Sequence, residues 1–169
     1  TARVGSTSLT AIVSAGATDP SRVFTPASLL AFAALAIAAL AETGRIPVDN
    51  PSTHLELTMV HEAMILEYSG RDLALVEWAS GMRLTILLGL LANLFVPWGI
   101  ATTTAATTTG LAGLAAGTGV FVGKVLLLGA ALAAGEVWAA KLRLFRVPEL
   151  LAGSFVLALL AVLASYVLA

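Results

Sequence analysis

The chain has 169 residues, of which 59% are apolar and 11% charged, against about 45–50% and about 25% in soluble domains. Lys and Arg number 9 against 10 Asp and Glu, a formal net charge of -1, so no basic surface exists to neutralise nucleic-acid phosphates. No cysteine occurs, which excludes disulfides, thiolate metal sites and cysteine-ligated iron–sulfur clusters, and the composition predicts a protein whose solvent is the lipid bilayer.

The first apolar run follows a mixed amino-terminal segment. Residues 1–22 combine Ser, Thr, Ala and Gly with isolated apolar side chains, which is typical of a loop or an interrupted element, and we assign them no role. Residues 23–41 contain 19 amino acids without a charge, close to the roughly 20 that a spanning helix needs. Thr25 is expected to cap this helix, with Pro26 in its first turn. We predict a first transmembrane helix here.

Three further apolar runs predict three more transmembrane helices. They cover residues 84–101, 111–138 and 150–168. The first of these ends beside Pro97 and Trp98, a helix stop and an aromatic residue typical of the membrane interface. A Thr-rich connection, residues 102–110, follows it and has no charge.

The positions of the cations predict the orientation in the membrane. Lys and Arg occur in the connections 42–83 and 139–149, whereas residues 102–110 have none. Because short loops rich in Lys and Arg stay in the cytoplasm, both termini are expected outside. The predicted fold is an all-α integral membrane protein of the cell inner (plasma) membrane, with four transmembrane helices and an amphipathic acidic cytoplasmic loop between the first and second.

The loop 42–83 concentrates the titratable groups of the chain. It holds both histidines and seven of the ten carboxylates: His54, His61, Glu42, Asp49, Glu56, Glu62, Glu67, Asp72 and Glu77. Thr53 and Glu56 have the spacing of a capping box, which predicts an amphipathic helix from Thr53 to about Tyr68, ended by Gly70. Such a helix suits contact with the spans and with a partner protein.

A metal site in this loop is the weaker interpretation. His54, Glu56, His61 and Glu62 have side chains that ligate metals. However, the two histidines lack the H-E-x-x-H spacing that places a pair on adjacent turns. We favour hydrogen-bonded packing or partner contact, and a solvated acidic face remains the plain alternative.

Lys124 is a charge in the middle of the third predicted span. An ammonium there costs roughly 2.5–3.5 kcal/mol on insertion scales, so it is expected to face a polar interior and to pair with a carboxylate. Glu136 lies roughly 18 Å further along the same helix at 1.5 Å per residue, too far for a direct bond. Glu42, at the membrane boundary, or a neighbouring subunit is the expected source of the partner, and snorkelling to an interface is the alternative.

Two segments carry a family resemblance. Residues 41–70, AETGRIPVDNPSTHLELTMVHEAMILEYSG, closely resemble the membrane subunit of formate hydrogenlyase and hydrogenase-4 complexes, a family that includes the quinone-proximal membrane subunit of respiratory complex I. The complex I loop has the form E-x-x-R-x-P-F-D, then several acids and E-Y. The matching residues here are Glu42, Arg45, Pro47, Asp49, Glu67 and Tyr68. Lys124, Glu136 and AKLRLFRVPELL, residues 140–151, resemble the hydrogenase branch. The resemblance covers about residues 29–169 and corresponds to the later half of a family member with roughly eight spans.

The resemblance implies a non-catalytic membrane subunit of an oxidoreductase complex, of the group 4 [NiFe]-hydrogenase type. Such a subunit anchors a peripheral arm of hydrogenase and iron–sulfur subunits to antiporter-like membrane subunits, and couples electron transfer to proton or sodium translocation. The iron–sulfur clusters and the [NiFe] centre are then expected on the partner subunits, with no cofactor in this chain.

The resemblance also implies residue roles. The charged path would consist of Glu42, Arg45, Asp49, Glu56, Glu67, Lys124 and Glu136, with Arg45 paired to a loop carboxylate. We assign partner docking to His54, His61, Glu62, Tyr68, Lys141, Arg143 and Arg146. Ser52 and His54 stand where complex I members have further acids, which favours the hydrogenase branch. A complex I subunit contributing to a quinone site, and a purely structural anchor, remain the alternatives.

Overall fold

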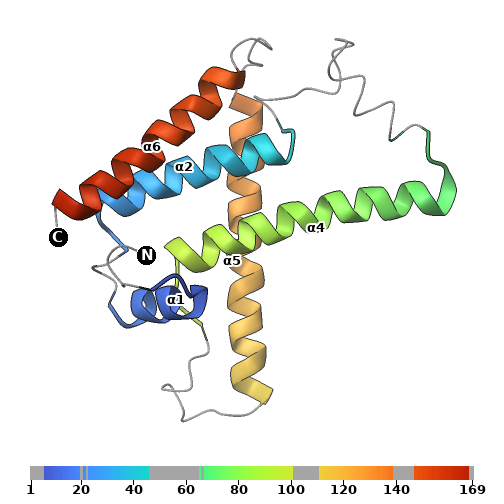
Figure 1. The fold of residues 1–169 in the computed structure, drawn as a ribbon. Helices are drawn as coiled ribbons and strands as arrows, with labels where there is room; N and C mark the ends of the chain where they lie inside the picture. The colour runs from blue at the N-terminus through green and yellow to red at the C-terminus, as the bar shows by residue number, and fades with distance from the viewer. Residues whose placement is uncertain are drawn as a thin grey trace.

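The described part of the chain is entirely helical, as the sequence predicts. The computed structural model describes residues 6–19, 21, 23–45, 65, 67–100, 111–138 and 147–167. Its helices are α1 (Leu9–Thr18), α2 (Pro26–Glu42), α4 (Gly70–Phe95), α5 (Leu111–Trp138) and α6 (Val147–Val167) (Figure 1). Within those ranges α4, α5 and residues 148–167 of α6 are long and apolar enough to cross a membrane, whereas α1 and α2 are shorter apolar helices.

The start of α2 follows its local sequence. The Thr25 hydroxyl accepts a hydrogen bond from the backbone N–H of Ser28 at 3.2 Å, and Pro26 occupies the first turn. The expected cap is therefore confirmed. Proline fits there because the first N–H groups of a helix have no intrahelical acceptor.

Helix α4 differs from the second predicted span at both ends. Its first part, residues 70–83, was expected in the acidic loop that leads into the second span, and the structure makes this segment helical and continuous with that span. Asp72 lies in the first turn, where the helix dipole favours an anion. The helix ends at Phe95, short of residue 101, because Pro97 cannot continue it and restricts the residue before it.

The other elements lie close to their expected positions. Helix α5 has the bounds of the third apolar run, and α6 begins at Val147, a few residues before 150, with Pro148 in its first turn. The amino-terminal segment, expected to be a loop or an interrupted element, contains the ten-residue helix α1. This helix packs against α4.

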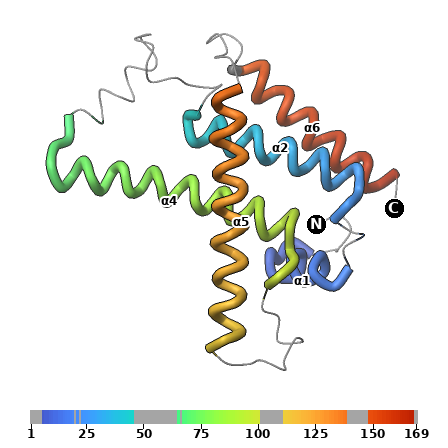
Figure 2. Tube along the Cα trace, turned by 180° about the vertical axis from the view of Figure 1, so that it is seen from behind, coloured from blue at the N-terminus to red at the C-terminus, as the bar shows by residue number. Residues whose placement is uncertain are grey.

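Helix α2 lies antiparallel to the carboxyl-terminal half of α4. Phe24, before α2, stacks on Trp98, after α4, with ring centroids 5.4 Å apart. Further along α2, Phe32 meets Phe95 edge to face at 5.2 Å. The amino-terminal half of α4 consequently extends beyond the end of α2 (Figures 1 and 2).

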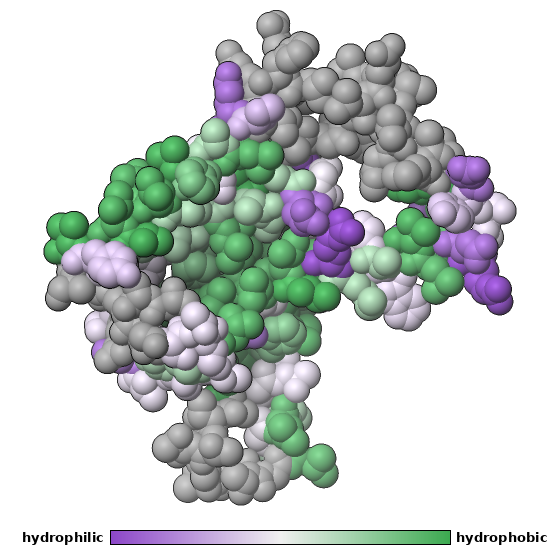
Figure 3. Space-filling model, in the orientation of Figure 1, coloured by the Kyte–Doolittle hydropathy of each residue, from purple (hydrophilic) through white to green (hydrophobic). Residues whose placement is uncertain are grey.

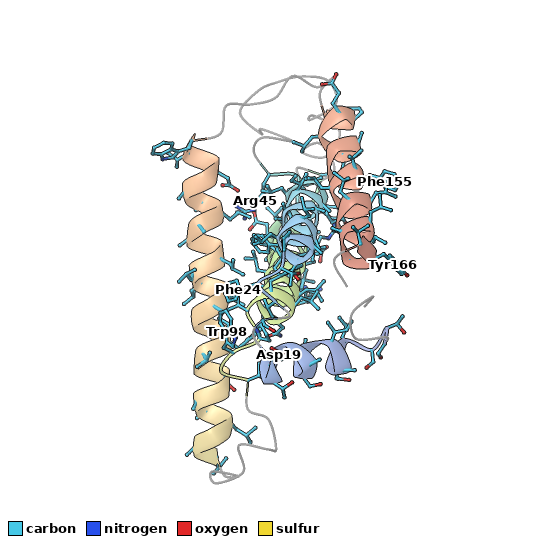
Figure 4. The ribbon with its side chains drawn as sticks, turned by 90° about the vertical axis from the view of Figure 1, so that its left-hand side faces the viewer. Asp19, Phe24, Arg45, Trp98, Phe155 and Tyr166 are labelled. Atoms are coloured by element: carbon cyan, nitrogen blue, oxygen red, sulfur yellow. The ribbon has the colours of Figure 1, made fainter. Side chains whose placement is uncertain are left out.

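Helices α2 and α6 form the most extensive helix pair in the described part. Both helices bury small residues: Ala27, Ala34 and Ala39 on α2, and Ser154 and Ala161 on α6. The Ser154 hydroxyl donates to the backbone carbonyl of Ala34 at 2.8 Å. Small side chains let two helices approach closely, which is how helices associate where lipid replaces water. The outer side of α6 is apolar (Figure 3), with Phe155 and Tyr166 directed away from α2 (Figure 4).

We expect Ser154→Ala to destabilise this pair by about 0.5–1 kcal/mol, the usual contribution of one interhelical hydrogen bond in a membrane protein. Ser154→Leu should cost more, because a large side chain would separate α6 from α2. Thermal unfolding in mild detergent measures both variants. Equal stability of the Leu variant and the unmodified chain would contradict this packing.

Helix α5 crosses α4 and has no buried residue of its own (Figures 1 and 2). The turn after α4 approaches it most closely at Gly99, whose φ is +73°. A Cβ atom on Gly99 would lie 2.6 Å from Cγ1 of Val120, so a residue without a side chain is required there. The carboxyl-terminal end of α4 therefore meets the middle of α5.

Candidate charged site between three helices

A Schellman motif ends α2 and fixes the position of Arg45. The backbone N–H of Arg45 donates to the carbonyl of Leu40, and that of Gly44 to the carbonyl of Ala41, both at 3.2 Å. Gly44 has φ +61°, the left-handed conformation that this motif requires and that favours glycine. Thr-Gly after a long apolar run is a helix-end signal, and it would have predicted that Arg45 is anchored to α2.

Arg45 forms an ion pair with Glu136 of α5. Its Nη1 lies 3.0 Å from Oε1 of Glu136, and the two side chains are 40% and 21% exposed. Figure 4 shows Arg45 between the end of α2 and α5. The expected partner was a loop carboxylate, but in the described part Arg45 reaches across to α5, because its backbone is held on the last turn of α2 beside that helix.

Glu42, the last residue of α2, pairs with Arg83 of α4. Nη1 of Arg83 lies 3.5 Å from Oε1 of Glu42, and both side chains are about 60% exposed (62% and 63%). An ion pair this accessible contributes little to stability in water. Its main effect is to hold the Glu42 carboxylate beside α4. In the sequence, Arg83 indicates only the orientation of the chain in the membrane, and no local pattern identifies it as the partner of Glu42.

Lys124 binds the carbonyl end of α4. Its ammonium donates to the backbone carbonyl oxygens of Val96, at 2.5 Å, and of Trp98. The prediction of a carboxylate partner is therefore wrong for the described residues. The end of a helix has carbonyls without intrahelical donors and a partial negative charge, and Pro97 supplies no N–H. These carbonyl dipoles stabilise the ammonium without neutralising its charge.

The contacts connect α2, α4 and α5 pairwise. Glu42 and Arg83 join α2 to α4, and Arg45 and Glu136 join α2 to α5. Lys124 joins α5 to α4. We call Glu42, Arg45, Arg83 and Glu136 the charged site. Each of its two carboxylates is paired with a guanidinium.

The structure does not bring Glu67 or Tyr68 to the charged site. Both residues directly precede α4, and the helix from Gly70 to Arg83 extends roughly 20 Å at 1.5 Å per residue. The remaining candidates lie outside the described residues: Asp49, His54, Glu56, His61, Glu62, Lys141, Arg143 and Arg146.

The described ranges contain no group of three or more His, Asp or Glu side chains that could hold a metal ion. The four residues weighed as metal ligands are all in the part that is not described. The charged site itself consists of ion pairs between carboxylates and guanidinium groups.

Comparisons with known proteins point to one family. A family model described as NADH dehydrogenase matches residues 1–167. Hydrogenase-4 component C of Escherichia coli (strain K12) is 36% identical over 72 residues, which are 43% of this chain and 22% of that protein. Formate hydrogenlyase subunit 4 of the same organism is 31% identical over 71 residues, 42% of this chain and 22% of that protein. The matched segments thus cover about a fifth of each relative. No solved structure matches the chain.

Proposed function

We propose, from the premise that this chain belongs to the NADH dehydrogenase family, that it is an integral membrane subunit of a hydrogenase complex. The complex would resemble those of hydrogenase-4 component C and formate hydrogenlyase subunit 4. The subunit anchors a peripheral electron-transfer arm and couples it to proton or sodium translocation. The observation that carries this proposal is the charged site, which joins three apolar helices through two carboxylates and two guanidinium groups.

In this proposal α2, α4, α5 and α6 are the four helices that cross the inner membrane. Helices α2 and α4 run antiparallel to each other, whereas α5 lies across α4 (Figures 1 and 2), so α5 crosses the bilayer at a different tilt. Three of them have the required length and hydropathy. Helix α2 has 17 residues, or about 26 Å at 1.5 Å per residue, slightly less than the roughly 30 Å hydrocarbon core. Both termini lie outside, and the loops containing residues 46–69 and 139–146 lie in the cytoplasm.

The coupling proposal assigns roles on both sides of the charged site. Asp49, Glu56 and Glu67 line the entrance from the peripheral arm. Iron–sulfur clusters and a [NiFe] centre reside on the partner subunits of that arm, which dock on the cytoplasmic loops. Electron transfer changes the charge or hydration of the loop, and the carboxylates of Glu42 and Glu136 respond by exchanging protons or partners. Antiporter-like subunits complete ion translocation.

Glu42→Gln tests this role. In membrane vesicles containing the whole complex, we expect hydrogenase activity with an artificial dye to stay within about twofold of normal. Coupled ion movement should fall at least about tenfold, because an amide cannot exchange a proton at this position. Glu149→Gln, an exposed acid in the first turn of α6, is the matched control and should leave both activities unchanged.

Three other outcomes would contradict the proposal. Normal ion movement in Glu42→Gln vesicles removes Glu42 from the path. A lower yield of complex, with normal coupling in every complex that assembles, indicates a purely structural anchor. Quinone-dependent turnover that quinone-site inhibitors block supports a quinone site of the complex I type.

A further inference from the structure

Glu42 and Arg45 are obvious local partners that do not pair with each other. They lie three residues apart in the sequence, Glu42 as the last residue of α2 and Arg45 just beyond the Schellman turn, and opposite charges this close along the chain attract. Nevertheless Glu42 contacts Arg83 at 3.5 Å, and Arg45 contacts Glu136 at 3.0 Å. Glu42 and Arg45 therefore each form an ion pair with a residue of another helix and not with each other.

The antiparallel packing of α2 and α4 explains how Glu42 obtains a different partner. Phe32 contacts Phe95, and ten residues further along α2 Glu42 contacts Arg83. Arg71 lies on the same helix roughly 18 Å further away at 1.5 Å per residue, and Lys124 is bound to backbone carbonyls. Arg83 is thus the cation of α4 that the packing brings to Glu42.

We propose that Arg83 is a positioning residue that selects the partner of Arg45. By holding Glu42, Arg83 occupies a carboxylate three residues from Arg45 that could compete for its guanidinium, and so leaves Arg45 to Glu136. The consequence for ion coupling rests on the proposed function, whereas the choice of partner is a property of this chain.

Two pairing patterns follow from this geometry. In the observed one, all four charges of the site have a partner. In the other, Glu42 pairs with Arg45, and both Arg83 and Glu136 lose their partners. Glu136 is the more buried of the two carboxylates, with 21% exposure. A carboxylate with less access to water is destabilised more by the loss of its cation. A displacement of α4 that takes Arg83 away from Glu42 would therefore release Glu136 on α5.

The experiment measures the distance between α2 and α5 in the whole complex. Nitroxide labels are attached through unnatural amino acids at Thr43, next to the charged end of α2, and at Val137, which is 84% exposed on α5. Pulsed electron paramagnetic resonance then gives the distance distribution. We expect a narrow distribution with Arg83 and with Arg83→Lys, and a longer or broader one with Arg83→Gln. Arg71→Gln, on the same helix, is the matched control and should have no effect.

The double variant Arg83→Gln/Glu42→Gln is decisive. With the competing carboxylate removed, Arg45 should return to Glu136, and the narrow distribution should be restored. A residue that merely supports the packing of α2 on α4 would not be rescued in this way. An unchanged distribution in Arg83→Gln, or the absence of rescue in the double variant, would overturn the proposal.

Coupling measurements separate this inference from the proposed function. In vesicles, Arg83→Gln should lower ion movement per electron at least about tenfold, and Arg83→Lys should retain it within about threefold. If the distances change as expected but ion movement does not, partner selection holds and the coupling function fails. If neither changes, partner selection is wrong.

Discussion

Lys124→Met is expected to lower the stability of the folded chain without reducing its insertion into the membrane. The substitution removes the donor of two charge-assisted hydrogen bonds to the carbonyls of Val96 and Trp98. Such bonds contribute about 1.5–3 kcal/mol each when they are desolvated, but the contact is part-buried at Val96 and exposed at Trp98, so solvent can replace part of the loss. Methionine also removes an insertion cost of roughly 2.5–3.5 kcal/mol, but this benefit applies to the inserted, unpacked chain as well.

The net loss should be about 2–4 kcal/mol, or roughly 5–15 °C in the unfolding midpoint for a chain of this size. Thermal unfolding in detergent measures the midpoint, and the amount of chain in the membrane fraction measures insertion. Lys124→Arg keeps hydrogen-bond donors and should retain most of the stability. Leu127→Met, on an exposed part of the same helix, is the control for the new side chain. An unchanged midpoint in Lys124→Met would show that the contact with α4 does not stabilise the fold.

Gly99→Ala tests the same junction from the α4 side. The new Cβ would lie 2.6 Å from Val120, at a φ of +73°, so the turn must move away from α5. We expect the Lys124 contact to weaken with it. Gly119→Ala is a matched control, because nothing lies within 4 Å of a Cβ at that position.

Removing either charge of the Arg45–Glu136 ion pair is expected to lower both the stability of the folded chain and the coupled ion movement. Glu136→Gln leaves the guanidinium of Arg45 without its anion, and Arg45→Gln leaves Glu136, 21% exposed, without its cation. Breaking a fully buried pair costs about 3–5 kcal/mol, but Arg45 is 40% exposed and solvent screens the pair. We therefore expect about 1–2 kcal/mol for either single substitution, and at least a tenfold loss of ion movement.

The charge-exchanged variant Arg45→Glu/Glu136→Arg provides the test. Thermal unfolding of both single variants and the double variant gives a double-mutant cycle, which isolates the interaction between the two sites. Recovery of stability to within about 1 kcal/mol is expected, whereas coupling should remain impaired because the carboxylate has moved to α2. Strictly additive losses in the cycle would indicate that the two residues do not interact.

The apolar segments were predictable because each depends on a continuous local pattern. The cap at Thr25 and the stop near Pro97 are likewise local, since both concern hydrogen bonds within a few residues. The start of α4 was not predictable from hydropathy, because residues 70–83 are charged but helical. The family was identified correctly from the segments around Glu42 and Lys124.

Local sequence alone showed that the chain is rich in apolar helical runs, that a lysine lies inside one of them, and that the acids gather next to the first. Only the packing of the helices settled which charges meet. It joined Arg45 to Glu136, Glu42 to Arg83 and Lys124 to the carbonyl end of α4. The physical reason is that these contacts connect residues between 26 and 91 positions apart, so they depend on the antiparallel packing of α2 on α4 and the crossing of α5. The partner of Lys124 is the carbonyl end of a helix. Backbone carbonyls occur at every position, so no residue type in the sequence marks this partner.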